Sequence, residues 1–205
     1  MIGVRTVTLL AFLIALSASL ICAQDLSSYR DFQFGMNLNA VAKQAGMNLS
    51  EAKTLHQHPA LIQELWWQRS FGGSSPQTDP VREVVFSFYD GALFRMVVNF
   101  DWHRTEGFTD EDMIEAISSK YGLAAKPVAT IVLFSSSLVY NDNEKVIARW
   151  EDSQYSYNLY RSSNQPVFGM LVFSKRLDAL AQMAIAKAIQ LDNQEAPQQE
   201  REHRK

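Results

Sequence analysis

Two apolar runs joined by Asp90-Gly91 constrain the fold more than any other feature of this chain. The runs cover residues 84–89 and 92–98, and both are rich in the valine and aromatic residues that favour strands. Asp and Gly tolerate positive φ, which suits the two-residue type I′ turn that right-twisted strands prefer. The sequence therefore predicts an antiparallel hairpin here.

The side chains of this hairpin divide between two faces. With a two-residue turn, Phe88 pairs with Leu93, and Phe86 pairs with Arg95 on the same face. The opposite face also carries large apolar side chains, among them Met96. Because both faces are substantially apolar, we expect helices to cover one side of the sheet and a second layer, a partner or a ligand to cover part of the other.

Hydrophobic periodicity and capping residues predict two helices before the hairpin. The first begins after Asn37 and ends at Gly46. A second, short helix is expected at 50–56, because Asn48 and Glu51 have the spacing of a capping box.

Two further helices and several strands follow the hairpin. One helix begins after Thr109 and ends at Gly122, and a long terminal helix begins after Ser174 with apolar residues along one side. The remaining strands are expected at 61–69, 129–134, 146–150, 155–160 and 166–173. The fold class predicted is α+β, with a curved antiparallel sheet packed against short helices and one longer C-terminal helix.

The chain is expected to form a single domain at 24–192. Segments 32–101 and 105–175 both run from a helix closed by glycine into antiparallel strands, so they are possible tandem repeats. Residues 193–205 are polar and charged, and we expect them to form a disordered tail.

The N-terminus has the pattern of a secretory signal peptide. Arg5 precedes an uncharged, largely apolar run at 6–21, and the small residue Ala23 precedes polar residues. The run is short for a helix that must cross roughly 30 Å of hydrocarbon. We therefore expect residues 1–23 to be cleaved and the protein to be periplasmic or extracellular. The alternative is a lipoprotein anchored at Cys22, which would bring membrane contact.

Charge and cysteine content exclude several function classes. The formal net charge is -3, and loss of the leader removes one Arg and no acid, which gives -4. Such a chain has no electrostatic footprint for nucleic acid, so no DNA or RNA partner is expected. Cys22 is the only cysteine, so the mature chain would contain no disulfide, thiol nucleophile or thiolate metal ligand.

Residues 32–100 carry a series of sequence features in a defined order. That order is Gly35-Met36, a short helix ending at Gly46, a strand bearing Trp66 or Trp67, and the hairpin at Asp90-Gly91. This half resembles one repeat of the fold shared by the outer-membrane-assembly lipoprotein SmpA/OmlA and the secreted β-lactamase inhibitor protein. Segment 107–173 would be a second copy with a longer loop. The resemblance implies a non-catalytic module that binds other proteins on a concave sheet.

Catalytic and metal-binding patterns have simpler explanations in this chain. His56, His58, His103 and Asp101 are residue types that bind zinc, but residues two apart on a helix point away from each other. The acids at 110–112 suit a helix start, and those at 151–152 suit a turn. We expect no metal and no cofactor.

Aromatic side chains are the strongest candidates for a binding surface, because tryptophan and tyrosine are favoured at protein contacts. Arginines on neighbouring strands would add specificity. The candidate binding residues are Trp66, Trp67, Arg95, Trp102, Trp150, Tyr155 and Tyr157. The function predicted is that of a non-catalytic module that binds another exported or envelope protein through an aromatic sheet face. The alternatives are an envelope hydrolase whose acids converge in three dimensions and a carrier of a small apolar ligand.

Overall fold

The computed structural model describes residues 25–69, 79–128, 130–132, 143–162 and 167–202. The expected leader at 1–23, Cys22 included, lies outside these residues, as does the end of the expected tail at 203–205. In the described part of the chain, no helix combines the length and the apolar character that crossing a membrane requires.

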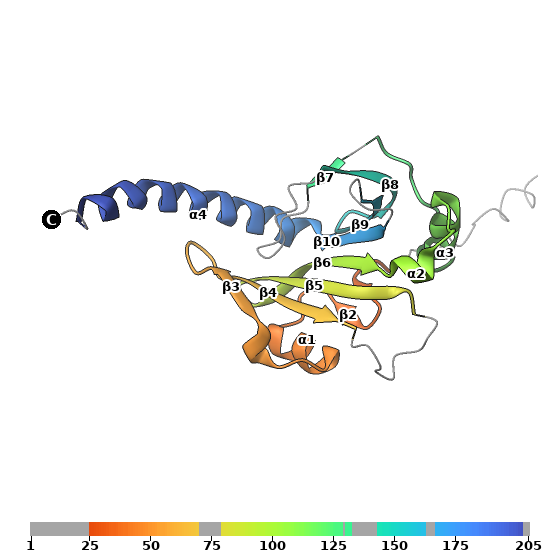
Figure 1. Ribbon diagram of the computed structural model, residues 1–205, viewed down its shortest axis with the longest axis horizontal. Coiled ribbons are helices and arrows are strands. Elements are labelled where there is room, and N and C mark those ends of the chain that lie inside the picture. Colours follow the sequence, from red (N-terminus) through yellow and green to blue (C-terminus); the bar gives the residue numbers. More distant parts are fainter. Residues whose placement is uncertain (1–24, 70–78, 129, 133–142, 163–166, 203–205) are drawn as a thin grey trace, which may run out of the picture.

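An antiparallel sheet forms the body of the protein (Figure 1). Its strand order across the described residues is β3 (Lys53–His56), β4 (Ile62–Gln68), β5 (Val81–Tyr89), β6 (Ala92–Phe100), β10 (Phe168–Ser174), β9 (Tyr155–Arg161), β8 (Asn143–Glu151) and β7 (Thr130–Val132). The order places β6 and β10 at the centre. Each half of the chain therefore contributes four successive strands that run outward from this seam.

Short helices precede the strands of each half, and a small hairpin also precedes those of the first half. The described elements outside the main sheet are β1 (Ser28–Tyr29), β2 (Phe32–Gln33), α1 (Leu38–Ala45), the 3-10 turn η1 (Leu49–Glu51), α2 (Trp102–Thr105), α3 (Asp110–Tyr121) and α4 (Lys175–Glu202). The predicted α+β class, with an antiparallel sheet and a longer C-terminal helix, is confirmed.

The predicted caps of the first and third helices are confirmed. The Asn37 side chain accepts a hydrogen bond from the Ala40 N–H at 2.8 Å, and Gly46 ends α1 with a φ of 69°. Thr109 and Asp112 form a capping box at the start of α3. These local interactions satisfy helix-end groups that would otherwise lack partners.

The helix predicted at 50–56 is wrong. Asn48 and Glu51 do form the predicted capping box, but it supports only the single turn η1. Residues 53–56 instead form β3, which pairs with the beginning of β4. Hydrogen bonding to a neighbouring strand outweighs a weak local helix signal of this kind.

The turn of the central hairpin is confirmed, but part of its register is not as predicted. Asp90 and Gly91 both have positive φ, at 46° and 79°. Phe88 pairs with Leu93, whereas Arg95 pairs with Ser87 because the register shifts between these two pairs. A bulge of this kind admits one extra residue on one strand. It turns the Arg95 side chain to the face opposite Phe86.

The two faces of the sheet have different covers. The face that carries Phe86 and Tyr157, called here the helix face, holds the main core and packs against α1, α3 and the β1–β2 hairpin. The opposite face carries Ile62 and Phe94, which pack against Ala181 of α4, and it is called here the α4 face. The core of the helix face contains buried residues from both halves of the chain.

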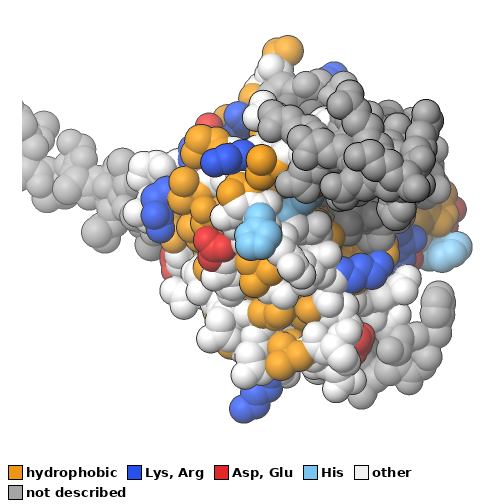
Figure 2. All heavy atoms as spheres, turned by 90° about the vertical axis from the view of Figure 1, so that its left-hand side faces the viewer, with side chains coloured by type: hydrophobic (Ala, Val, Ile, Leu, Met, Phe, Trp, Pro, Cys, Tyr) orange, Lys and Arg blue, Asp and Glu red, His pale blue; other side chains and the backbone are white. Residues whose placement is uncertain are grey.

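The first half of the terminal helix packs on the body, where Ala181, Ala184 and Ala188 are buried, and the rest projects from it (Figure 1). Arg95 Nε donates to Asp178 Oδ1 at 2.8 Å, and both side chains are largely buried. The helix continues to Glu202, through most of the segment 193–205 that was expected to be a disordered tail. Figure 2 shows the side from which α4 projects, where hydrophobic side chains alternate with polar and charged ones over the coloured surface.

Candidate functional site

The aromatic candidates of the second half belong to the core. Trp150 and Tyr157 are almost completely buried on the helix face. The Trp150 indole N–H donates to the Gly122 carbonyl oxygen at 2.9 Å, and the Tyr157 hydroxyl donates to the Ser28 carbonyl oxygen at 2.6 Å. Both polar groups are satisfied inside the molecule, so these two side chains do not offer a contact surface.

Tyr157 stands in a cluster of buried tyrosines. Its ring lies 4.9 Å from that of Tyr121 and 6.3 Å from that of Tyr29, measured between centroids. Burial raises the pKa of Tyr29 to about 12 and raises the pKa values of Tyr121 and Tyr157 as well. These hydroxyls stay neutral and act as packing groups.

The remaining sheet candidates lie on opposite faces. Trp67 and Tyr155 pack against the core of the helix face, and the Tyr155 ring stacks on Phe34 at a centroid distance of 5.2 Å. Trp66 and Arg95 lie on the α4 face, where the indole N–H of Trp66 is buried without a hydrogen-bond partner. The predicted residues therefore do not form one aromatic sheet surface.

Trp102 is the candidate that stands at the surface. It begins α2, the short helix that follows β6, and 37% of its surface is exposed. Asp101 caps this helix by accepting from the His103 N–H at 2.9 Å. Phe108, just beyond α2, is 45% exposed. We call the surface made by Trp102, His103, Arg104 and Phe108 the α2 corner.

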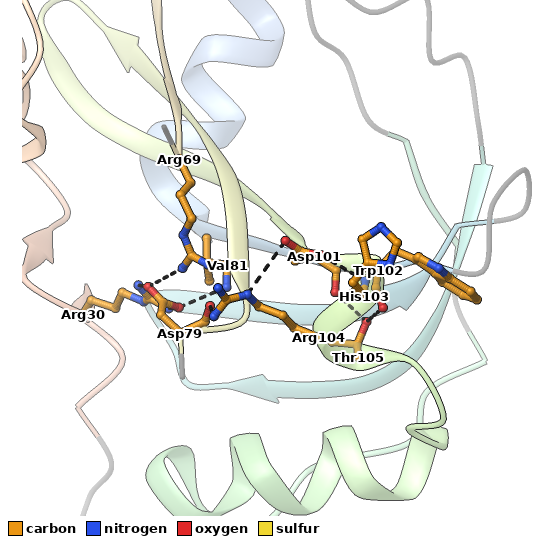
Figure 3. Close-up of polar contacts among 9 residues, drawn as sticks. All are labelled: Arg30, Arg69, Asp79, Val81, Asp101, Trp102, His103, Arg104 and Thr105. Atoms are coloured by element: carbon orange, nitrogen blue, oxygen red, sulfur yellow. Dashed lines mark hydrogen bonds and ion pairs between the residues drawn. The ribbon is translucent and has the colours of Figure 1, made fainter. Parts of the chain in front are cut away.

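Beside the α2 corner lies a group of arginines that share one carboxylate (Figure 3). Arg30 donates to both oxygens of Asp79 at 2.8 and 2.7 Å, and Arg69 Nη2 lies 3.2 Å from Asp79 Oδ2. Arg104 Nη1 donates to the Asp79 carbonyl oxygen at 3.1 Å, and its Nε lies 3.9 Å from Asp101. We call these five residues the arginine cluster.

The arginine cluster strongly favours the charged forms of its members. Burial alone would raise the pKa of Asp79, but the hydrogen bonds from Arg30 and the Val81 N–H and the charges of Arg30 and Arg69 lower it to about 2. The hydrogen bonds that Arg30 donates to Asp79 raise the pKa of Arg30. Three guanidiniums against two carboxylates leave one positive charge in the cluster.

Arg69 is incompletely satisfied. Its side chain is 12% exposed, and its Nε, Nη1 and Nη2 atoms are buried and make no hydrogen bond. Among the described residues, Asp79 is the polar partner of its guanidinium. Burying guanidinium N–H groups without acceptors is costly, so this arrangement calls for an additional acceptor.

The acidic pairs expected at helix starts and turns have structural partners. Asp110 lies 3.0 Å from Arg161, and Glu151 lies 2.8 Å from Lys175. Asp112 accepts from the Thr109 N–H within the capping box, which lowers the pKa of Asp112. Across the residues that the structure describes, no three His, Cys, Asp or Glu side chains are grouped as ligands of a metal ion.

Sequence reasoning found Trp102 but missed the arginine cluster. Arg30, Arg69 and Asp79 are far apart in the chain, so no spacing pattern joins them. The β1–β2 hairpin carries Arg30 to the start of β5, where Asp79 binds the Val81 N–H at 3.0 Å. The sequence signal available was an Asp-Pro pair before a strand, which indicates only a turn.

Comparisons with known proteins add no family. No family model matches the chain, and neither a curated protein nor a solved structure matches it. Function is therefore inferred from the geometry of the residues themselves.

Proposed function

We propose that this chain is an exported, non-catalytic protein-binding module and that the α2 corner is its contact surface. The exposed indole of Trp102 beside the arginine cluster is the observation that carries the proposal. Tryptophan and arginine are the residues most enriched among those that dominate protein–protein binding energy. The resemblance of residues 32–100 to exported binding modules supports the same class of function.

The contact surface proposed here differs from the aromatic sheet face expected from the sequence. Trp150 and Tyr157 are core residues, whereas Trp102 and Phe108 are exposed on one short stretch of chain. Large aromatic side chains cost little conformational entropy when a partner immobilises them, because few torsions are lost. The exposed side chains of Trp102 and Phe108 are therefore better suited to contact a partner than to stabilise the folded chain.

The binding function is tested by cross-linking the exported protein in its native compartment and identifying the captured partner. We expect Trp102→Ala to weaken binding of that partner by about 30-fold or more, because truncating a dominant aromatic contact costs about 2 kcal/mol. Leu49→Ala is the matched control, since Leu49 is an exposed apolar residue on another element. Equal binding by both variants and the parent would contradict the proposed surface.

The export part of the proposal has its own test. The apolar run at 6–21 and the small residue Ala23 support cleavage before Gln24. Mass spectrometry of the purified mature protein should show a chain that begins at Gln24. An acylated N-terminal Cys22 would instead establish the lipoprotein alternative, and an intact chain in the cytosol would refute export.

A further inference from the structure

We infer that the arginine cluster is a carboxylate-binding site and that it takes the side-chain carboxylate of an Asp or Glu residue on the bound protein. This inference rests on the proposed binding function and names the chemistry of the partner at one point. It uses groups that the α2 corner alone does not include, namely Arg30 and Arg69.

The charge of the cluster selects an anion with a single negative charge. Arg30, Arg69 and Arg104 face Asp79 and Asp101, so one positive charge is left over. The chain as a whole is acidic, with a formal net charge of -3. A local positive site on an acidic protein attracts an acidic group there, while the rest of the surface repels it.

The unpaired N–H donors of Arg69 require hydrogen-bond acceptors, which a bound anion would supply. Nε and Nη1 of Arg69 have no acceptor, and the ion pair with Asp79 is made through Nη2 alone. A guanidinium presents its donors in a planar fork that matches the two oxygens of a carboxylate. A bound carboxylate would therefore satisfy donors that the folded chain leaves unpaired.

The layout of the cluster favours a carboxylate from an Asp or Glu side chain of the partner over the carboxylate of the partner's C-terminus. Figure 3 shows Arg30, Asp79, Arg104 and Trp102 in sequence across the site, with Arg69 beside Asp79. Arg30 and Arg104 are 36% and 30% exposed and form the accessible rim, and Arg69 is the least exposed of the three arginines. A partner segment that also covers Trp102 would continue past the cluster, which places a side chain there.

The site is tested on the mature protein with sodium acetate as the probe. The Nε–H signals of the arginine side chains are followed by NMR while acetate replaces chloride at constant ionic strength. We expect the Arg69 signal, assigned by its loss in Arg69→Met, to shift and saturate with acetate. An equal, non-saturating response to both salts would overturn the site.

Variants and peptides separate specific binding from general charge effects. Followed through the Nε–H signals of Arg30 and Arg104, acetate binding is expected to weaken about tenfold or more in Arg69→Gln, because one charge-assisted hydrogen-bonding partner is lost. Arg176→Gln, an exposed arginine on α4, is the matched control and should bind as the parent does. Unchanged binding by Arg69→Gln would overturn the role of Arg69.

Short capped peptides identify the source of the carboxylate. Acetyl-Gly-Glu-Gly-amide should compete with acetate at the Arg69 signal, and acetyl-Gly-Gln-Gly-amide should not. A third peptide, acetyl-Gly-Gln-Gly, keeps a free C-terminal carboxylate. If this peptide alone competes with acetate, the site binds a chain terminus and the assignment to a side-chain carboxylate is overturned.

Failure of this inference is distinguishable from failure of the proposed function. If the cross-linked partner depends on Trp102 but binds Arg69→Gln normally, the contact surface stands and the carboxylate site is wrong. If acetate binds at Arg69 but no variant of the α2 corner affects the partner, the proposed function is wrong.

Discussion

Asp79 is the residue at which separate segments of the chain meet. It receives two hydrogen bonds from Arg30 of the β1–β2 hairpin and an ion pair from Arg69 at the end of β4. Its own carboxylate also accepts the Val81 N–H at the start of β5. A side chain with so many contacts between elements links local electrostatics to the stability of the whole fold.

The stability of the protein should therefore depend on pH through Asp79. Its pKa is about 2 in the folded protein against an ordinary value of 3.8, so its contribution to stability is complete above the higher value and is lost as the pH falls toward 2. Urea unfolding from about pH 5 to about pH 2 should show a smaller loss of stability in Asp79→Asn than in the parent.

Asp31→Asn is the control for this measurement, because Asp31 is an exposed acid on the same hairpin. It should reproduce the parent's loss of stability over the same pH range. If Asp79→Asn also does so, the network around Asp79 does not set the acid sensitivity.

At the scale of single elements, the ion pair between Arg95 and Asp178 attaches α4 to the sheet. The two side chains are 8% and 16% exposed. Asp178→Ala should lower the free energy of unfolding by about 3 kcal/mol, because it leaves Arg95 buried without its counter-charge. The double variant Arg95→Met/Asp178→Ala should lose about 2 kcal/mol less than Asp178→Ala alone, since it removes both buried charges and keeps an apolar stem beside Phe94.

Urea unfolding measures both variants, with Asp192→Ala on the exposed part of α4 as the control. Equal losses in Asp178→Ala and in the double variant would mean that the pair contributes through attraction and not through avoidance of an unpaired charge. That result would contradict the reasoning above.

Element-level prediction succeeded where a signal was local. The Asp90-Gly91 turn and the caps at Asn37 and Thr109 depend on residues within one or two turns, and all three occur as predicted. The helix at 50–56 failed because strand pairing with β4 decided its conformation. The bulge that reorients Arg95 also left no pattern in the sequence, because it adjusts one strand to its neighbour.

At the scale of the whole molecule, the two halves share one sheet and one core. β6 and β10 pair along Arg95 to Asn99, and Gly169 lets the Tyr160 ring lie close against β10, since a Cβ there would approach the ring to 2.3 Å. Tyr160 then reaches across to Asn99, whose Oδ1 accepts at 3.3 Å. These contacts join strands of the two halves on the α4 face.

The halves should consequently unfold together. In urea, tryptophan fluorescence and far-ultraviolet circular dichroism should give one coincident transition, as expected for a single cooperative unit. In Trp150→Phe the fluorescence comes from the tryptophans within residues 66–102 alone. The unfolding transition of this variant by fluorescence should still coincide with its transition by circular dichroism. Two separated transitions would show that each half is a folding unit of its own.

The sequence by itself determined the α+β class, the central hairpin and the helix caps, because turn geometry, periodicity and capping act between near neighbours. Only the tertiary structure decided which aromatic residues face solvent and where the arginines meet. Arg30, Arg69 and Asp79 come together through strand pairing across long loops, and burial of Trp150 and Tyr157 depends on the elements that pack over them. Such contacts arise from the summed packing of the whole chain, which no local pattern records.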